Sequence, residues 1–186
     1  MQAQPTYRIL GIDPGTNVLG YAVIEIRKKQ PLLLHLGTLN MGHLDSPYLK
    51  LQHIFQGVVE IITKYTPQQM AVEAPFYGKN VQSMLKLGRA QGVAIAAGMT
   101  NGIEVTEYAP KKIKQSVTGN GNASKEQVSA MLASVFNRKM TDAGLDATDA
   151  LATALCHFYK SGSVLNGKKK YSGWESFLKD NPDRQK

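Results

Sequence analysis

Four acidic residues of this chain occupy places where an α/β protein gathers its chemistry: Asp13, Glu73, Asp146 and Asp149. Asp13 and Glu73 each end a short apolar run, and ligands of α/β sheets bind beyond the carboxyl ends of strands. Asp146 and Asp149 are three residues apart, a spacing that puts both side chains on one face of a helix. Taken singly, each carboxylate has an ordinary structural explanation as a turn, strand-end or capping residue.

The four carboxylates would lie together in one site if the helix that carries Asp146 and Asp149 packs across the sheet. Their mutual repulsion would then require raised pKa values or bound cations. Carboxylate oxygens without a Cys or His cluster select Mg²⁺, for which Mn²⁺ can substitute. Two such ions about 4 Å apart suit phosphodiester hydrolysis, since one activates water and the other stabilises the leaving oxygen. The pattern therefore predicts a catalytic site with two Mg²⁺ ions.

The overall charge favours nucleic acid as the partner of such a site. The chain has 186 residues, with 22 Lys and Arg against 14 Asp and Glu, for a net charge of +8. A basic balance of this size suits a polyanion better than a small acidic metabolite. The single cysteine, Cys156, indicates a reducing compartment. With no apolar run near 18 residues and no secretory signal pattern, we expect no membrane association and a cytoplasmic location.

Part of the positive charge falls inside the expected folded region. The stretch 78–125 carries seven Lys and Arg against two Glu, a net charge of +5. We take six of these cations as candidate DNA contacts: Lys79, Lys86, Arg89, Lys111, Lys114 and Lys125. The stretch 160–186 carries seven cations and three acids, or +4, and its Gly, Ser and Lys content predicts a tail.

The elements that would position these residues follow from hydrophobic periodicity. Short apolar runs predict strands at 7–12, 21–26, 32–39, 70–73 and 103–108. Apolar residues at three- and four-residue steps predict helices at 51–65, 80–99, 124–137 and 144–160. The order predicts one α/β domain over 1–160, with a five-stranded mixed sheet flanked by helices and a basic tail over 161–186.

Four segments together resemble the RuvC family of Holliday junction resolvases. They are Ile9-Leu-Gly-Ile-Asp13-Pro-Gly15, Ala71-Val-Glu73, Lys86-Leu-Gly-Arg89-Ala-Gln-Gly92 and Asp146-Ala-Thr-Asp149-Ala-Leu-Ala152. The resemblance covers about residues 8–159. It implies an RNase H-like fold and a homodimer that nicks four-way DNA junctions symmetrically with Mg²⁺. Asp13, Glu73, Asp146 and Asp149 match the family's four catalytic carboxylates.

The resemblance also implies further roles and partners. It places Phe76, with Tyr77 beside it, as an aromatic that stacks on bases near the crossover, a contact worth about 1 to 3 kcal/mol per base. Lys114 and Lys125 match basic residues near the scissile phosphate. A branch-migration helicase complex of RuvA and RuvB is the implied protein partner.

Several alternatives stay open at this point. A ribonuclease H acting on RNA–DNA hybrids would share the fold and the metals, and a non-catalytic junction-binding subunit would share the substrate. The small residues Gly88, Gly92, Ala96 and Gly98 of helix 80–99 allow close packing, either on the chain's own sheet or on a second copy. The sequence alone favours neither packing within the chain nor packing between two copies, and the resemblance favours the dimer. His157 lies about 16 Å along its helix from Asp146, so we predict a core histidine.

Overall fold

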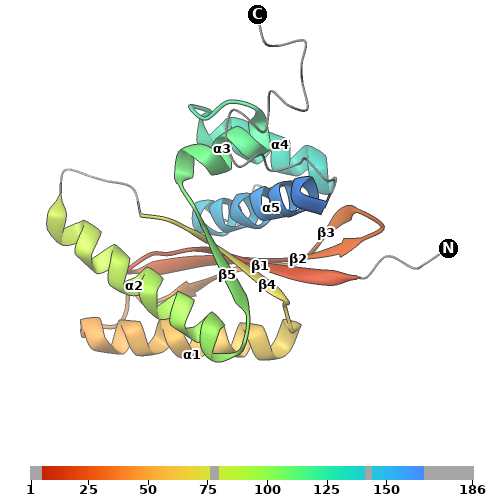
Figure 1. The fold of residues 1–186 in the computed structure, drawn as a ribbon. Helices are drawn as coiled ribbons and strands as arrows, with labels where there is room; N and C mark the ends of the chain where they lie inside the picture. The colour runs from red at the N-terminus through yellow and green to blue at the C-terminus, as the bar shows by residue number, and fades with distance from the viewer. Residues whose placement is uncertain (1–5, 76–79, 141–143, 166–186) are drawn as a thin grey trace, which may run out of the picture.

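A mixed five-stranded sheet forms the centre of the protein (Figure 1). The computed structural model describes residues 6–75, 80–140 and 144–165. The strands are β1 (Tyr7–Asp13), β2 (Val18–Arg27), β3 (Gln30–Asn40), β4 (Gln69–Glu73) and β5 (Glu104–Tyr108). Their spatial order is β3-β2-β1-β4-β5, with β1 antiparallel to β2 and parallel to β4. The predicted sheet is confirmed, although β2 begins three residues earlier than the periodicity indicated.

Helices cover both faces of the sheet (Figure 1). On one face lie α1 (Pro47–Tyr65) and α2 (Val81–Thr100). On the other lie α3 (Pro110–Thr118), α4 (Lys125–Phe136) and α5 (Leu145–Leu165). Alternate β1 side chains enter the two cores: Leu10 and Ile12 pack with α1 and α2, and Ile9 packs with the opposite layer. This alternation decides which layer the residues at the strand ends face.

Three helices differ from the expectation, and one of them, α1, differs only in beginning at Pro47 and not at residue 51. The nine-residue α3 was not predicted as a separate helix, because it follows β5 after one residue and buries only Ile113 and Val117. A segment so short shows too few apolar repeats to stand out, although Pro110 at its first turn is a favourable start. The last helix, α5, continues past residue 160 to Leu165, beyond the predicted domain boundary. The proposed tail after that lies outside the described residues.

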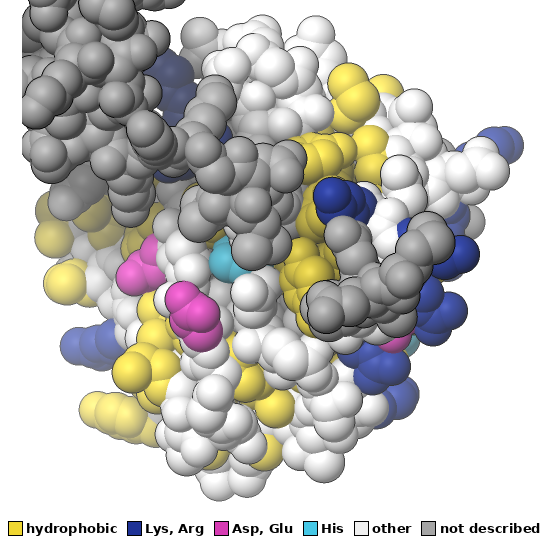
Figure 2. All heavy atoms as spheres, turned by 45° about the vertical axis from the view of Figure 1, so that its right-hand side comes forward, with side chains coloured by type: hydrophobic (Ala, Val, Ile, Leu, Met, Phe, Trp, Pro, Cys, Tyr) yellow, Lys and Arg dark blue, Asp and Glu magenta, His cyan; other side chains and the backbone are white. Residues whose placement is uncertain are grey.

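The surface in Figure 2 carries more basic than acidic side chains, with many of the lysines and arginines along one edge of the view. One buried carboxylate, Glu25, accepts from Arg8 Nε at 2.9 Å and also pairs with Arg27. This ion-pair cluster lies at the end of the sheet opposite Asp13, because Arg8 is the second residue of β1 and Asp13 is its last. Within the described ranges, no helix is both long and apolar enough to cross a membrane.

Candidate active site

The register of β1 and β4 places two of the four carboxylates side by side. Gly11 is paired with Ala71 and Ile12 with Val72, so Asp13 and Glu73 come next at the carboxyl ends of two adjacent parallel strands. Adjacent strands lie about 4.8 Å apart. Asp13 is two residues beyond Gly11 and therefore points to the same face, the one covered by α5.

Glycine at two positions of the sheet lets α5 reach that face. Gly20 pairs with Asp13 across β1 and β2, and a Cβ added at Gly20 would lie 2.0 Å from the Asp146 carbonyl oxygen. A Cβ at Gly11 would lie 2.2 Å from the carbonyl oxygen of Ala150. Any larger residue would force the helix away from the strands. The close contact brings the first turns of α5, with Asp146 and Asp149, beside Asp13.

Burial and the neighbouring acids change the protonation of this cluster. Burial raises the pKa of Asp13 to about 8, with further contributions from the charges of Glu73, Asp149 and Asp146. Burial also raises the pKa of Glu73 to about 7, helped by Asp149. Near neutral pH the chain alone therefore holds protons on its central carboxyl groups. A divalent cation would replace those protons, because it stabilises the ionised form.

Lys125 supplies a positive charge from the chain itself. It is the first residue of α4, after a capping box formed by Ser124 and Gln127, and its Nζ donates to Asp149 Oδ2 at 2.7 Å. That hydrogen bond raises the pKa of Lys125. A cation at a helix start is unfavourable by itself. The resemblance places Lys125 near the scissile phosphate, and in the structure its partner is the Asp149 carboxylate.

The donor set fits Mg²⁺ in its chemistry. Four carboxyl groups on three elements supply only hard oxygen atoms, and the two central ones are desolvated enough to favour a bound cation. In the part of the chain that the structure describes, no three His, Cys, Asp or Glu side chains are already arranged around a single metal position. Side-chain rotation, and release of Asp149 by Lys125, would accompany metal binding.

The other predicted site residues fall into four groups. Lys114, on α3, is near enough to Glu73 for its charge to lower the pKa of that carboxyl. Lys86 and Arg89 line a cavity between α1 and α2. Lys111 is exposed and lies close to Gly121, with no contact to the carboxylates. Phe76, Tyr77 and Lys79 lie outside the described residues.

Gln91 supports the site, a role that the sequence analysis missed. Its side chain is 7% exposed, and its Nε2 donates to Glu107 Oε2 at 2.5 Å and to the Glu73 carbonyl at 3.4 Å. These contacts fix the end of β4 that carries Glu73. A glutamine among small apolar residues of a helix was the available signal, but its partners are 16 and 18 residues away.

His157 is a core residue, as predicted. Its Nδ1 lies 2.9 Å from the Tyr108 hydroxyl and its Nε2 lies 3.2 Å from Gln69 Oε1. Burial lowers the pKa of His157, so the ring is neutral in the core. It belongs to the packing of α5 on the sheet and not to the carboxylate cluster.

Known proteins are similar to this chain in sequence and in fold. The family model described as "Crossover junction endodeoxyribonuclease RuvC" matches residues 9–157. Proteins of that name from Christiangramia forsetii and Cytophaga hutchinsonii are 52% and 53% identical, covering 95% and 96% of this chain and 91% and 88% of theirs. The Thermus thermophilus RuvC structure in complex with a Holliday junction substrate is 28% identical, with a TM-score of 0.79, covering 85% of this chain and 96% of that one.

The sheet order, the α5 contact and the acidic strand ends define an RNase H-like nuclease domain. Within that class, the family match over residues 9–157 and the identity above 50% are decisive. The chain belongs to the RuvC family of crossover junction endodeoxyribonucleases.

Proposed function

We propose that this protein resolves four-way DNA junctions as a homodimer, each subunit nicking one strand by hydrolysis with two Mg²⁺ ions. The observation that carries the proposal is the convergence of Asp13, Glu73 and α5 at one edge of the sheet. A basic chain that concentrates half-buried carboxyl groups at one point is suited to binding and cutting a polyanion. Manganese could replace magnesium, since both prefer oxygen ligands.

Each carboxylate has a role in this proposal. Asp13, Glu73, Asp146 and Asp149 would hold the metal ions, and Asp13 is close enough to the other three for their charges to raise its pKa. The bound ions supply an activated water and a stabilised leaving oxygen. The chain's own contribution is to hold the carboxylates on rigid strands and on a helix locked by glycine contacts.

Two lysines complete the site. When cations occupy the carboxylates, Lys125 is free to turn from Asp149 toward the scissile phosphate, as the family resemblance implies. Lys114, on the Glu73 side, would contact the same strand. Phe76 and Tyr77 would stack on bases near the crossover, and Lys79 and Lys111 would contact the backbone, also as proposals from the sequence.

The exposed face of α2 supports the proposed dimer. Val81, Leu85 and Met99 are 66%, 60% and 65% exposed, an unusual amount for apolar side chains on one helix. Gly88 and Gly92 have open space where a Cβ would lie, whereas Gly98 packs against Met70 of its own chain. The small residues therefore divide: Gly98 serves the chain's own core, and Gly88 and Gly92 are available to a second copy. A two-fold dimer would match the near two-fold symmetry of an open junction.

A substrate panel tests the proposal. The protein is incubated with a labelled four-way junction, the matching linear duplex and an RNA–DNA hybrid, each with Mg²⁺ or with EDTA. We expect Mg²⁺-dependent paired nicks in the junction only. Preferential cleavage of the hybrid would favour a ribonuclease H, and junction binding without cleavage would favour a binding subunit. Association with RuvA and RuvB, and a cytoplasmic location, stay predictions from the sequence.

A further inference from the structure

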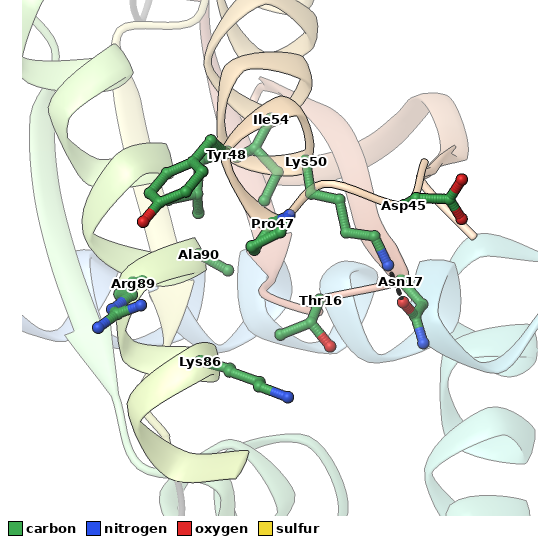
Figure 3. Close-up of a pocket in the computed structure, with 11 residues that line it drawn as sticks. Thr16, Asn17, Asp45, Pro47, Tyr48, Lys50, Ile54, Lys86, Arg89 and Ala90 are labelled. Atoms are coloured by element: carbon green, nitrogen blue, oxygen red, sulfur yellow. Dashed lines mark hydrogen bonds between the residues drawn. The ribbon is translucent and has the colours of Figure 1, made fainter. Parts of the chain in front are cut away.

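A cavity of about 320 Å³ lies between the first halves of α1 and α2, next to the loop that follows β1 (Figure 3). We call it the α1–α2 cavity. Its polar lining includes Thr16, Asn17, Tyr48, Lys50, Lys86 and Arg89. Lys50 from α1 and Lys86 from α2 extend toward the Thr16–Asn17 loop from opposite sides (Figure 3). Two helices and one loop thus direct cationic and hydrogen-bonding groups into one space.

The charges of this cavity are not balanced by the protein. Three cations line it against one carboxylate, Asp45. Among the described residues, no Asp or Glu lies within ion-pair distance of Lys86 or Arg89. Lys50 Nζ donates to Asn17 Oδ1 at 2.6 Å, a neutral partner that orients the ammonium without cancelling its charge. Cations held together without acidic partners favour an anionic ligand.

The position of the cavity relative to the active site indicates which anion is the ligand. Thr16 is three residues after Asp13, so their Cα atoms are at most about 11 Å apart, at 3.8 Å per residue. One DNA strand carries a phosphate about every 3.4 Å along the helix axis. A strand whose scissile phosphate lies at Asp13 therefore has another phosphate, within about three nucleotides, that can reach the cavity.

We infer that the α1–α2 cavity binds a backbone phosphate of the strand being cut, about three nucleotides from the scissile bond. Lys50 and Lys86 hold the phosphate from opposite sides, Asn17 and Thr16 supply hydrogen bonds, and Arg89 strengthens the positive potential. The Tyr48 ring, 78% exposed at the wall, packs on the sugar or base of the same nucleotide. This inference rests on the proposed junction cleavage and adds a second anchor that fixes the strand's register.

The test asks whether one lysine of the protein contacts one particular phosphate of the DNA. Binding is measured by fluorescence anisotropy with Mg²⁺, using Asp13→Asn protein so that the DNA stays uncut. The probes are four-way junctions in which a single phosphate near the cut is replaced by a neutral methylphosphonate. Lys50→Gln removes the cation, and Lys64→Gln, exposed near the other end of α1, is the matched control.

We expect Lys50→Gln to weaken binding of the unmodified junction about tenfold and to lower the slope of log affinity against log salt by about one. One methylphosphonate within about three nucleotides of the cut should weaken junction binding about tenfold when Lys50 is present. The same methylphosphonate should not weaken binding further in Lys50→Gln. Lys64→Gln should keep the full affinity and the full methylphosphonate penalty. Equal thermal melting of the variants shows that the fold is unchanged.

The inference is overturned if Lys50→Gln binds like Lys64→Gln, or if every methylphosphonate penalty persists in Lys50→Gln. Junction cleavage by protein with intact Asp13, measured in parallel, separates this result from the proposed function. If the junction is cut but the methylphosphonate penalty does not depend on Lys50, the cavity is not a phosphate site and the proposed nuclease activity stands. If the penalty depends on Lys50 but the junction is not cut, the phosphate site stands and the proposed resolvase activity is wrong.

Discussion

At the scale of single residues, Asp13 connects the electrostatics of the site to its chemistry. It ends the central strand, and burial together with the acids of β4 and α5 raises its pKa to about 8. The sequence was enough to single out Asp13, Glu73, Asp146 and Asp149, because strand ends and three-residue helix spacing are local patterns. The partner of Lys125 was not predictable in this way, since Asp149 is 24 residues away along the chain.

The raised pKa of Asp13 predicts an inverted pH dependence of stability in the metal-free protein. Folded Asp13 binds its proton more tightly than the unfolded residue, whose pKa is 3.8, so its contribution is full below that value and is lost as pH rises toward about 8. We expect Asp13→Asn to remove this loss, which amounts to a few kcal/mol at about 1.4 kcal/mol per pKa unit.

Urea unfolding in EDTA at pH 5 and pH 8 measures this effect. The difference in free energy of unfolding between Asp13→Asn and the unchanged protein should grow in favour of the variant as pH rises, because other titrating groups cancel in the difference. Added Mg²⁺ should restore the stability of the unchanged protein at pH 8. A difference that is constant over this range would contradict the assigned burial of Asp13.

The ion pair of Lys125 and Asp149 predicts competition between the lysine and the metal. Lys125→Gln removes a positive charge 2.7 Å from Asp149 Oδ2, which would hold a metal ion in the proposed function, so Mg²⁺ should bind several-fold more tightly without DNA. Cleavage should be slower, because the lysine also contacts the substrate in the proposed function. Calorimetric titration with Mg²⁺ measures the affinity, and Lys139→Gln, exposed beyond the other end of α4, is the control. Weaker Mg²⁺ binding by Lys125→Gln would contradict this role.

At the scale of elements, α5 and the sheet form the site together. All five strands and four of the five helices were predictable from periodicity, because their buried faces repeat within each segment. The contact of α5 with Gly11 and Gly20 was not, since it depends on backbone atoms more than 120 residues apart in sequence. From the sequence, the convergence of the four acids could therefore be predicted only on the condition that α5 packs across the sheet.

Gly20→Ala tests this contact directly. The new methyl group would lie 2.0 Å from the Asp146 carbonyl oxygen, a backbone atom that cannot move without shifting α5. We expect a loss of stability of about 1 to 3 kcal/mol and weaker Mg²⁺ binding, because Asp146 and Asp149 move with the helix. Gly42→Ala is the control, since its Cβ would meet only the Asn40 side chain at 3.3 Å. Equal stability and Mg²⁺ affinity in the two variants would show that α5 does not depend on Gly20.

At the scale of the whole molecule, the charge of +8 separates into two populations. Half-buried acids lie at one edge of the sheet, and three cations that form no ion pair among the described residues, Lys50, Lys86 and Arg89, line the α1–α2 cavity. The apolar face of α2 would join two such molecules. Composition indicated a polyanionic partner, but only the folded chain shows which cations lack an acidic neighbour.

Gly92→Glu tests the dimer at this scale. Nothing lies within 4 Å of the added Cβ in one chain, and glutamate favours a helix over glycine by up to about 1 kcal/mol, so the fold should be kept. A charged side chain at a two-fold contact should separate the copies. Analytical ultracentrifugation should show a dimer for the unchanged protein and for Ala130→Glu, which alters an exposed α4 position, and a monomer for Gly92→Glu. A dimer in all three would place the interface elsewhere.

The central claim is that one carboxylate cluster per subunit cuts one strand of a four-way junction. The most direct measurement counts the nicks made with Mg²⁺ by the unchanged protein, by Asp13→Asn, and by mixed dimers of the two. We predict paired nicks for the unchanged protein, a loss of about a thousandfold for Asp13→Asn, and single nicks for the mixed dimers. Paired nicks by Asp13→Asn or by the mixed dimers would contradict it.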